Sequence, residues 1–110
     1  MKVAVTSQNR KTVTGHAGKC RKFWIYDIDG GSVRERTLCE LPLEQTLHML
    51  EGDVPDPLRG ICALITQGAG MGMRDRLARH GIEVVLTRID DPDEAVSSWL
   101  AGHAASGASR

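Results

Sequence analysis

Short alternating patterns of apolar and polar residues predict three strands in the first half of the chain. Residues 2–7 (KVAVTS) alternate apolar and small polar side chains and are rich in β-branched residues. Residues 22–28 (KFWIYDI) are apolar on both faces, which is typical of a buried strand, whereas Arg34 and Arg36 in residues 32–38 (SVRERTL) indicate an exposed edge strand. The aspartate and two glycines between these last two strands predict a hairpin turn.

The second half of the chain alternates predicted strands and helices. The apolar run 61–66 (ICALIT) predicts a strand that leads through a glycine turn into a helix over 73–80 (MRDRLARH), and 82–86 (IEVVL) predicts a further short strand. A last helix is predicted to begin at Asp91, a capping residue that is followed by proline. Earlier in the chain, regularly spaced leucines in residues 42–50 predict another amphipathic helix.

This order of elements predicts an α/β fold with three layers. Five strands and three helices would form a mixed sheet with helices on both faces and with parallel connections in the second half. A length of 110 residues suits one hydrophobic core, so we expect a single domain over residues 1–102. Residues 103–110 are mostly small and polar, and we expect them to form a flexible, frayed tail.

The composition excludes several classes of protein. The chain has 14 basic and 14 acidic side chains, and a formal net charge of +0 provides no overall attraction to nucleic acid or to an anionic membrane. No apolar stretch reaches the roughly 18 residues that a membrane span needs, so we expect a cytoplasmic protein. Three cysteines without a C-x-x-C pair favour reduced thiols over a disulfide framework or a zinc ribbon.

The segment most typical of a binding site is the loop TGHAGKC, in which His16 lies between Gly15 and Gly18. The glycines allow the backbone to bend and to approach a ligand, and an imidazole can ligate a metal through either nitrogen. Five cations crowd the surrounding segment: Arg10, Lys11, Lys19, Arg21 and Lys22. Because none of the first 26 residues is acidic, this pattern predicts a positive patch that faces an anion. The alternative is a basic loop that only contacts solvent.

Cys20 is a candidate second soft ligand in the same loop. Its position between Lys19 and Arg21 would favour the ionised thiolate. The alternative is a small residue that packs at the entry to the hairpin, since one histidine and one cysteine are too few ligands for a structural zinc site. Cys39 and Cys62 are expected to pack as small hydrophobic residues.

A second candidate is the glycine-rich turn QGAGMGM after the run 61–66. Gly68 and Gly70 precede the predicted helix, where free backbone N–H groups and the helix dipole favour an anion. Met73 stands where a dinucleotide-binding fingerprint has its third glycine, so a tight turn without a ligand is the alternative. Since parallel strands end at one edge of a sheet, we expect this turn and the His16 loop to share one mouth.

The remaining candidate residues receive no functional role. The other histidines are assigned none: His48, His80 and His103. Phe23, Trp24 and Tyr26 alternate between the two faces of a strand, which favours core packing over the stacking of bases. No nucleophile elbow or strand carboxylate provides a catalytic constellation, so we expect no enzymatic activity.

The order of these motifs resembles the dinitrogenase iron-molybdenum cofactor biosynthesis family. The similarity covers about Met1 to Gly102 and runs through MKVAV, GHAG, FWIYDIDGG, ICALITQGAG, LARHGIEVV and DEAVSSWLAG. The resemblance implies a ribonuclease H-like α/β/α fold, and the family includes accessory proteins that hold nitrogenase cofactor or its iron-sulfur precursors during assembly.

The resemblance also implies site residues. The family's H-F-G loop, whose histidine is implicated in cluster binding, corresponds to His16, Ala17 and Gly18, and its glycine turn corresponds to Gly68 and Gly70. Ala17 replaces the family's aromatic residue, and we expect this replacement to leave a smaller and more open loop.

The residues and the resemblance lead to one functional hypothesis and two alternatives. The hypothesis is a non-catalytic carrier in nitrogen fixation that binds an anionic iron-molybdenum or iron-sulfur cluster at His16 and interacts with nitrogenase or cofactor-assembly proteins. One alternative is a regulatory interaction domain of the family that has lost cluster binding. The other is a binder of a small anion or nucleotide at residues 68–72. Nuclease activity is not expected, because residues 3–7 carry no carboxylate for a metal.

Overall fold

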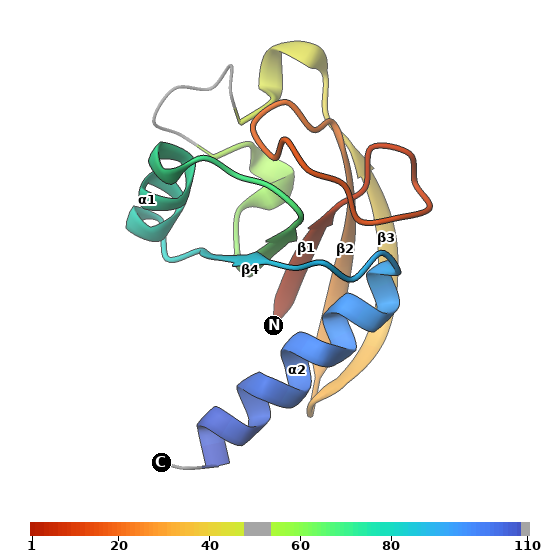
Figure 1. Ribbon diagram of the computed structural model, residues 1–110. Coiled ribbons are helices and arrows are strands. Elements are labelled where there is room, and N and C mark those ends of the chain that lie inside the picture. The colour runs from red at the N-terminus through yellow and green to blue at the C-terminus, as the bar shows by residue number, and fades with distance from the viewer. Residues whose placement is uncertain (48–53, 109–110) are drawn as a thin grey trace.

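The computed structural model describes residues 1–47 and 54–108, which contain a five-stranded mixed sheet (Figure 1). The strands are β1 (Lys2–Thr6), β2 (Lys22–Asp29), β3 (Ser32–Glu40), β4 (Ile61–Thr66) and β5 (Glu83–Leu86). They lie in the order β3-β2-β1-β4-β5, with β1 antiparallel to β2 and parallel to β4. The predicted hairpin, the edge position of β3 and the parallel second half are confirmed.

The turn between β2 and β3 requires its two glycines. Gly30 and Gly31 have φ angles of 60° and 81°, in the left-handed region that glycine enters without the steric penalty of a Cβ. The turn pairs Asp29 with Ser32 and closes the hairpin. It leaves β2 inside the sheet and β3 at its edge.

The two helices pack on opposite faces of the sheet, so the described residues form three layers (Figure 1). α1 (Met71–Arg79) contributes Leu77 to a core that includes Ala4 of β1. α2 (Pro92–Ala108) contributes Val96 to a second core, which includes Val3 and Val5. The alternation of side chains along β1 therefore serves both cores. Neither described helix is long and apolar enough to cross a membrane. The ribonuclease H-like designation stays a prediction.

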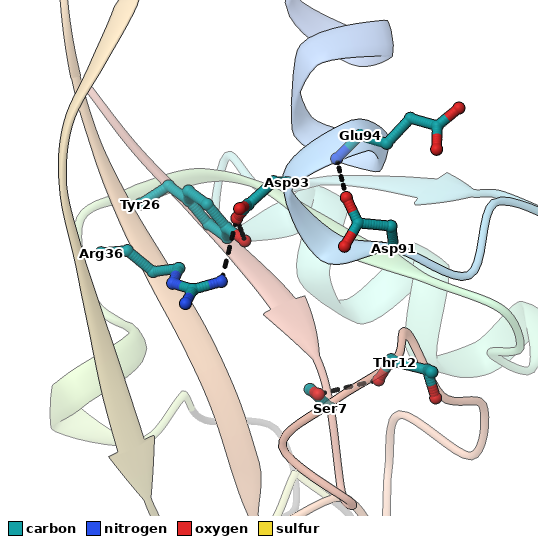
Figure 2. Close-up of polar contacts among 7 residues, drawn as sticks. All are labelled: Ser7, Thr12, Tyr26, Arg36, Asp91, Asp93 and Glu94. Carbon is teal, nitrogen blue, oxygen red and sulfur yellow. Dashed lines mark hydrogen bonds and ion pairs between the residues drawn. The ribbon is translucent and has the colours of Figure 1, made fainter.

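The start of α2 is fixed by polar contacts that Figure 2 shows. The Oδ2 atom of Asp91 accepts the backbone N–H of Glu94 at 2.9 Å, which confirms the predicted cap. Asp93, in the first turn, accepts hydrogen bonds from Tyr26 of β2 at 2.6 Å and from Arg36 of β3 at 3.0 Å. The helix runs to Ala108, beyond its predicted end at Gly102.

The helix predicted over residues 42–50 is wrong in its described part. A single 3-10 turn, Leu43–Gln45, ends at Thr46, whose φ and ψ of −65° and 157° are extended. Leu41 and Leu47 are buried, whereas Leu43 is 66% exposed. The two buried leucines thus lie on either side of this 3-10 turn rather than on one face of an α-helix. The rest of this prediction, with His48, lies outside the described residues. The described part of the chain therefore has two α-helices, not three.

Candidate functional site

The loop after β1 and the turn after β4 lie together at the carboxyl ends of these parallel strands and line a cavity of about 650 Å³. Its walls are residues 15–19, residues 67–70 and Met73. The backbone N–H of Ala17 donates to the carbonyl of Gly68 at 3.0 Å. A Cβ atom on Gly68 would lie 3.7 Å from the Cα atom of Gly15, so the two backbones are in close contact. The prediction of a shared mouth is confirmed.

Three threonines hold the two loops together. Thr6 and Thr66 end β1 and β4, and both are fully buried. The Thr6 hydroxyl donates to the carbonyl of Thr14 at 2.6 Å, and the Thr66 hydroxyl lies 2.9 Å from the Thr6 hydroxyl and 3.2 Å from the Gly68 carbonyl. Sequence reasoning missed these residues. No pattern of neighbouring residues marks them, because Thr6 and Thr66 are 60 positions apart in the sequence.

His16 is exposed at the cavity mouth, on a backbone of uncommon conformation. Its φ angle is 53°, in the left-handed region that residues with a Cβ seldom adopt. Its carbonyl accepts the backbone N–H groups of Lys19 at 2.9 Å and Cys20 at 3.1 Å, which fixes one tight turn. The sequence predicted that glycines would provide the bend, but Gly15 has no positive φ. The left-handed residue of the turn is the candidate ligand itself.

Ala17 packs into the interior of the protein. It is fully buried in the core cluster that contains Ala4 and Phe23. Its backbone N–H is bonded to Gly68, so residue 17 forms part of the inner wall of the cavity. That Ala17 leaves the loop more open than an aromatic residue would stays a prediction.

Cys20 is a buried thiol, contrary to the prediction of a favoured thiolate. The residue is 3% exposed, and its Sγ atom donates to the carbonyl of Lys22 at 3.0 Å. Burial raises the pKa of the Cys20 thiol above its ordinary value, and hydrogen bonds offset this effect only in part. The prediction failed because neighbours in sequence do not set solvent access. A buried thiol with a raised pKa is a poor metal ligand at neutral pH, because the thiolate is the form that binds a metal.

The electrostatics of the cavity come from fewer charges than the sequence predicted. Of the five cations near His16, only Lys19 lines the cavity, and the Arg21 guanidinium donates to the carbonyl of Leu41 at 2.9 Å. The N-terminus of α1 also faces this site, because Gly70 is both a wall residue and the N-cap. The first turn of α1 has no acidic residue and no side-chain cap. None of the described residues that line the cavity carries a carboxylate, so the charge of this lining favours an anion.

The remaining predicted positions lie elsewhere. His80 is the C-cap of α1 and lines a separate, smaller hollow. Phe23 packs in one core and Tyr26 in the other, as their alternation predicted. Within residues 1–47 and 54–108, no three or more histidine, cysteine, aspartate or glutamate side chains gather into a group that could hold a metal ion.

Comparison with known proteins identifies the family of this chain. The profile of the family described as "Dinitrogenase iron-molybdenum cofactor" matches residues 1–102. The chain belongs to this family. Membership relates the protein to the iron-molybdenum cofactor of dinitrogenase, and it confirms the resemblance inferred from the order of the motifs.

Relatives of this dinitrogenase cofactor family protein cover nearly its whole length. The uncharacterised protein MJ0580 of Methanocaldococcus jannaschii is 27% identical over 105 residues, which are 93% of this chain and 87% of that protein. The crystal structure of PH0822 superposes with a TM-score of 0.75 at 25% identity and covers 93% of this chain and 90% of its own. A "putative dinitrogenase" of M. jannaschii has a TM-score of 0.68 at 19% identity, with 93% and 89% covered, and supports the fold alone.

Proposed function

We propose that the cavity between the His16 loop and the glycine turn binds an anionic iron-molybdenum or iron-sulfur cluster, which the protein carries without catalysing a reaction. The observation that supports this proposal most strongly is the exposed imidazole of His16 at the mouth of a cavity whose described lining includes Lys19 and no carboxylate. The N-terminus of α1 adds partial positive charge on the opposite wall. This arrangement suits an anionic cluster that takes a single imidazole ligand from the protein.

The available donors fit a cluster that is already assembled. A cluster held entirely by the protein commonly takes four cysteine thiolates, whereas Cys20 is the one cysteine near this cavity and is buried with a raised pKa. A preassembled cluster brings its own sulfides and needs the protein only at an exchangeable position, which His16 would fill. Few protein ligands also favour release, as a carrier requires.

This proposal assigns the protein to nitrogenase cofactor biosynthesis or a related metallocluster pathway. Its partners would be nitrogenase or cofactor-assembly proteins, which give or receive the cluster at the open mouth of the cavity. We expect the exchange to occur in the cytoplasm, where thiols stay reduced.

Anaerobic titration of the metal-free protein with extracted iron-molybdenum cofactor tests the proposal. After gel filtration, iron content and visible absorption measure the cluster retained. We expect His16→Ala to weaken binding at least about tenfold, the equivalent of about 1.4 kcal/mol. The matched control is His80→Ala, which removes an imidazole that does not line this cavity and should leave binding unchanged.

Other results would favour the alternatives. If the wild-type protein retains no cluster but forms a stable complex with a nitrogenase component in metal-free extract, the regulatory interaction domain is favoured. Binding that survives His16→Ala contradicts the ligand role of His16. Thermal stabilisation by phosphate that depends on residues 68–72, without cluster binding, would favour a binder of small anions.

A further inference from the structure

His16 lies between two hollows, of which the proposed cluster site uses only one. Gly15, His16 and Lys19 also line a second hollow of about 280 Å³. Its other walls are Gln8, Thr14 and Cys20, and none of these lines the cavity shared with the glycine turn. The two hollows thus lie on different sides of the same short turn.

Two side chains of this second hollow, Gln8 and Lys19, can donate hydrogen bonds to a ligand. The Oε1 atom of Gln8 accepts the backbone N–H of Arg21 at 2.9 Å, which orients the side-chain amide and leaves its Nε2 group to donate. The backbone N–H of Gln8 donates to the hydroxyl of Thr14 at 3.0 Å, so residues 8 and 14 are held together. Lys19 adds an ammonium group, and the residues that the structure describes around the hollow include no carboxylate.

We propose that this second hollow binds a small organic acid through its carboxylate. A carboxylate has two oxygens that can accept from the Gln8 amide and the Lys19 ammonium at once. Gly15 and Cys20 form a less polar wall, which suits the methylene groups of an aliphatic acid and gives no advantage to inorganic phosphate. The volume is at the low end for ligand pockets, so the occupant is one small acid or one arm of a larger ligand.

Because the cluster cavity and the second hollow share the turn around His16, one ligand could contact both. A cluster that carries an organic acid would contact His16 with its metal and the second hollow with its carboxylate, and a bare cluster would lack the second contact. This step rests on the proposed function, whereas carboxylate binding itself does not. The two are therefore tested in separate experiments.

Citrate added to the metal-free, ¹⁵N-labelled protein is the direct probe. We expect the backbone amide signals of Gly15, Thr14 and Cys20 to shift in a saturable way, with smaller changes at Gly70 and Gly72. The affinity for inorganic phosphate, measured at equal ionic strength from the amide signals of Gly15, Thr14 and Cys20, should be less than a tenth of the affinity for citrate. Absence of citrate shifts, shifts centred on the glycine turn, or equal affinity for phosphate would each overturn the proposal.

Gln8→Glu tests the donor directly. The variant keeps an oxygen for the N–H of Arg21 but replaces the donating amide with a second, negatively charged oxygen. We expect citrate affinity to fall at least about tenfold, and Lys11→Gln, which removes a charge outside the hollow, to change it less than twofold. Unchanged citrate affinity in Gln8→Glu would overturn the assignment, whether or not the cluster titration succeeds.

Discussion

Two regions of the molecule are held together by different interactions. One is the loop pair, which consists of the His16 loop (residues 14–19) and the glycine turn (residues 67–70). The other is the seam between the hairpin and α2. In the seam, which consists of Trp24, Tyr26, Arg36 and Asp93, side chains bond to side chains. Tyr26 and Arg36 donate to the same Asp93 oxygen (Figure 2). The Arg36 guanidinium carbon also lies 4.1 Å from the centre of the Trp24 ring. In the loop pair, buried threonine hydroxyls and backbone groups make the contacts.

This difference explains how side chains at the carboxyl ends of β1 and β4 remain available to bind a ligand. In the seam, Tyr26, Arg36 and Asp93 bond to one another, and these contacts stabilise the attachment of α2. In the described part of the loop pair, neither His16 nor Lys19 uses its side chain in a hydrogen bond or an ion pair. The threonines hold the loops, so stability and binding depend on different residues. Substitutions that separate the two properties test this account.

The largest loss of stability is expected for Thr66→Val, which breaks the contacts of the loop pair. The valine keeps the shape but removes a buried hydroxyl, so the Thr6 hydroxyl and the Gly68 carbonyl lose a partner. We expect the free energy of unfolding to fall by about 1–3 kcal/mol in urea denaturation. Thr66→Ser, which keeps the hydroxyl, serves as the control and should lose less. Equal losses in the two variants would mean that the hydroxyl does not hold the loops.

A smaller loss is expected for Tyr26→Phe in the seam. The variant removes one hydrogen bond to Asp93, whose side chain is 64% exposed and keeps the contact with Arg36. We expect the free energy of unfolding to fall by about 1 kcal/mol. Cluster binding should remain at the wild-type level, because the seam shares no wall residue with the cavity. A parallel loss of cluster binding would contradict the separation of the two regions.

Alkaline pH should destabilise the protein partly through the seam. Burial, and then the hydrogen bond to Asp93, raise the pKa of Tyr26 above its ordinary value of 10.0. The unfolded chain releases this proton as the pH rises above 10, whereas the folded chain keeps it, so stability falls in that range. Urea midpoints measured between pH 8 and pH 11 should fall less steeply in Tyr26→Phe than in the wild type. Identical slopes would exclude this contribution.

The smallest change in stability is expected for His16→Gly. Glycine relieves the left-handed conformation at φ 53°, but it also increases the entropy of the unfolded chain. Because these effects oppose each other, the free energy of unfolding should stay within about 1 kcal/mol of the wild type. Cluster binding should nevertheless be lost. Thermal denaturation and the anaerobic titration measure the two properties, and a strongly destabilised variant would show that His16 has a structural role.

Much of the fold could be predicted from the sequence, because its signals are local. The Gly30–Gly31 turn, the Asp91 cap and the apolar runs each specify one element through neighbouring residues. The leucines of residues 42–50 were misleading, since the burial of Leu41 and Leu47 by tertiary contacts outweighs helical spacing. Burial also made the interpretation of Cys20 wrong, because its neighbours in sequence do not reveal which way the side chain faces.

The location of the candidate site could also be predicted, but its construction could not. Parallel strands that end at one edge bring His16 and Gly68 together in any fold of this order. The threonine contacts join residues up to 60 positions apart in the sequence, and no local pattern marks them. Of the five cations that the sequence groups around His16, only Lys19 lines the cavity, because a cluster in the sequence does not determine which side chains face a ligand.

Pulsed electron paramagnetic resonance of the cluster-loaded protein tests the central claim most directly. With ¹⁵N-labelled histidine and a paramagnetic state of the cluster, a nitrogen coordinated to the metal produces a hyperfine coupling of the ¹⁵N type. The account predicts this coupling in the wild type and in His80→Ala and its loss in His16→Ala. A bound cluster without any histidine coupling, or a coupling that persists in His16→Ala, would contradict the assignment of His16 as the ligand.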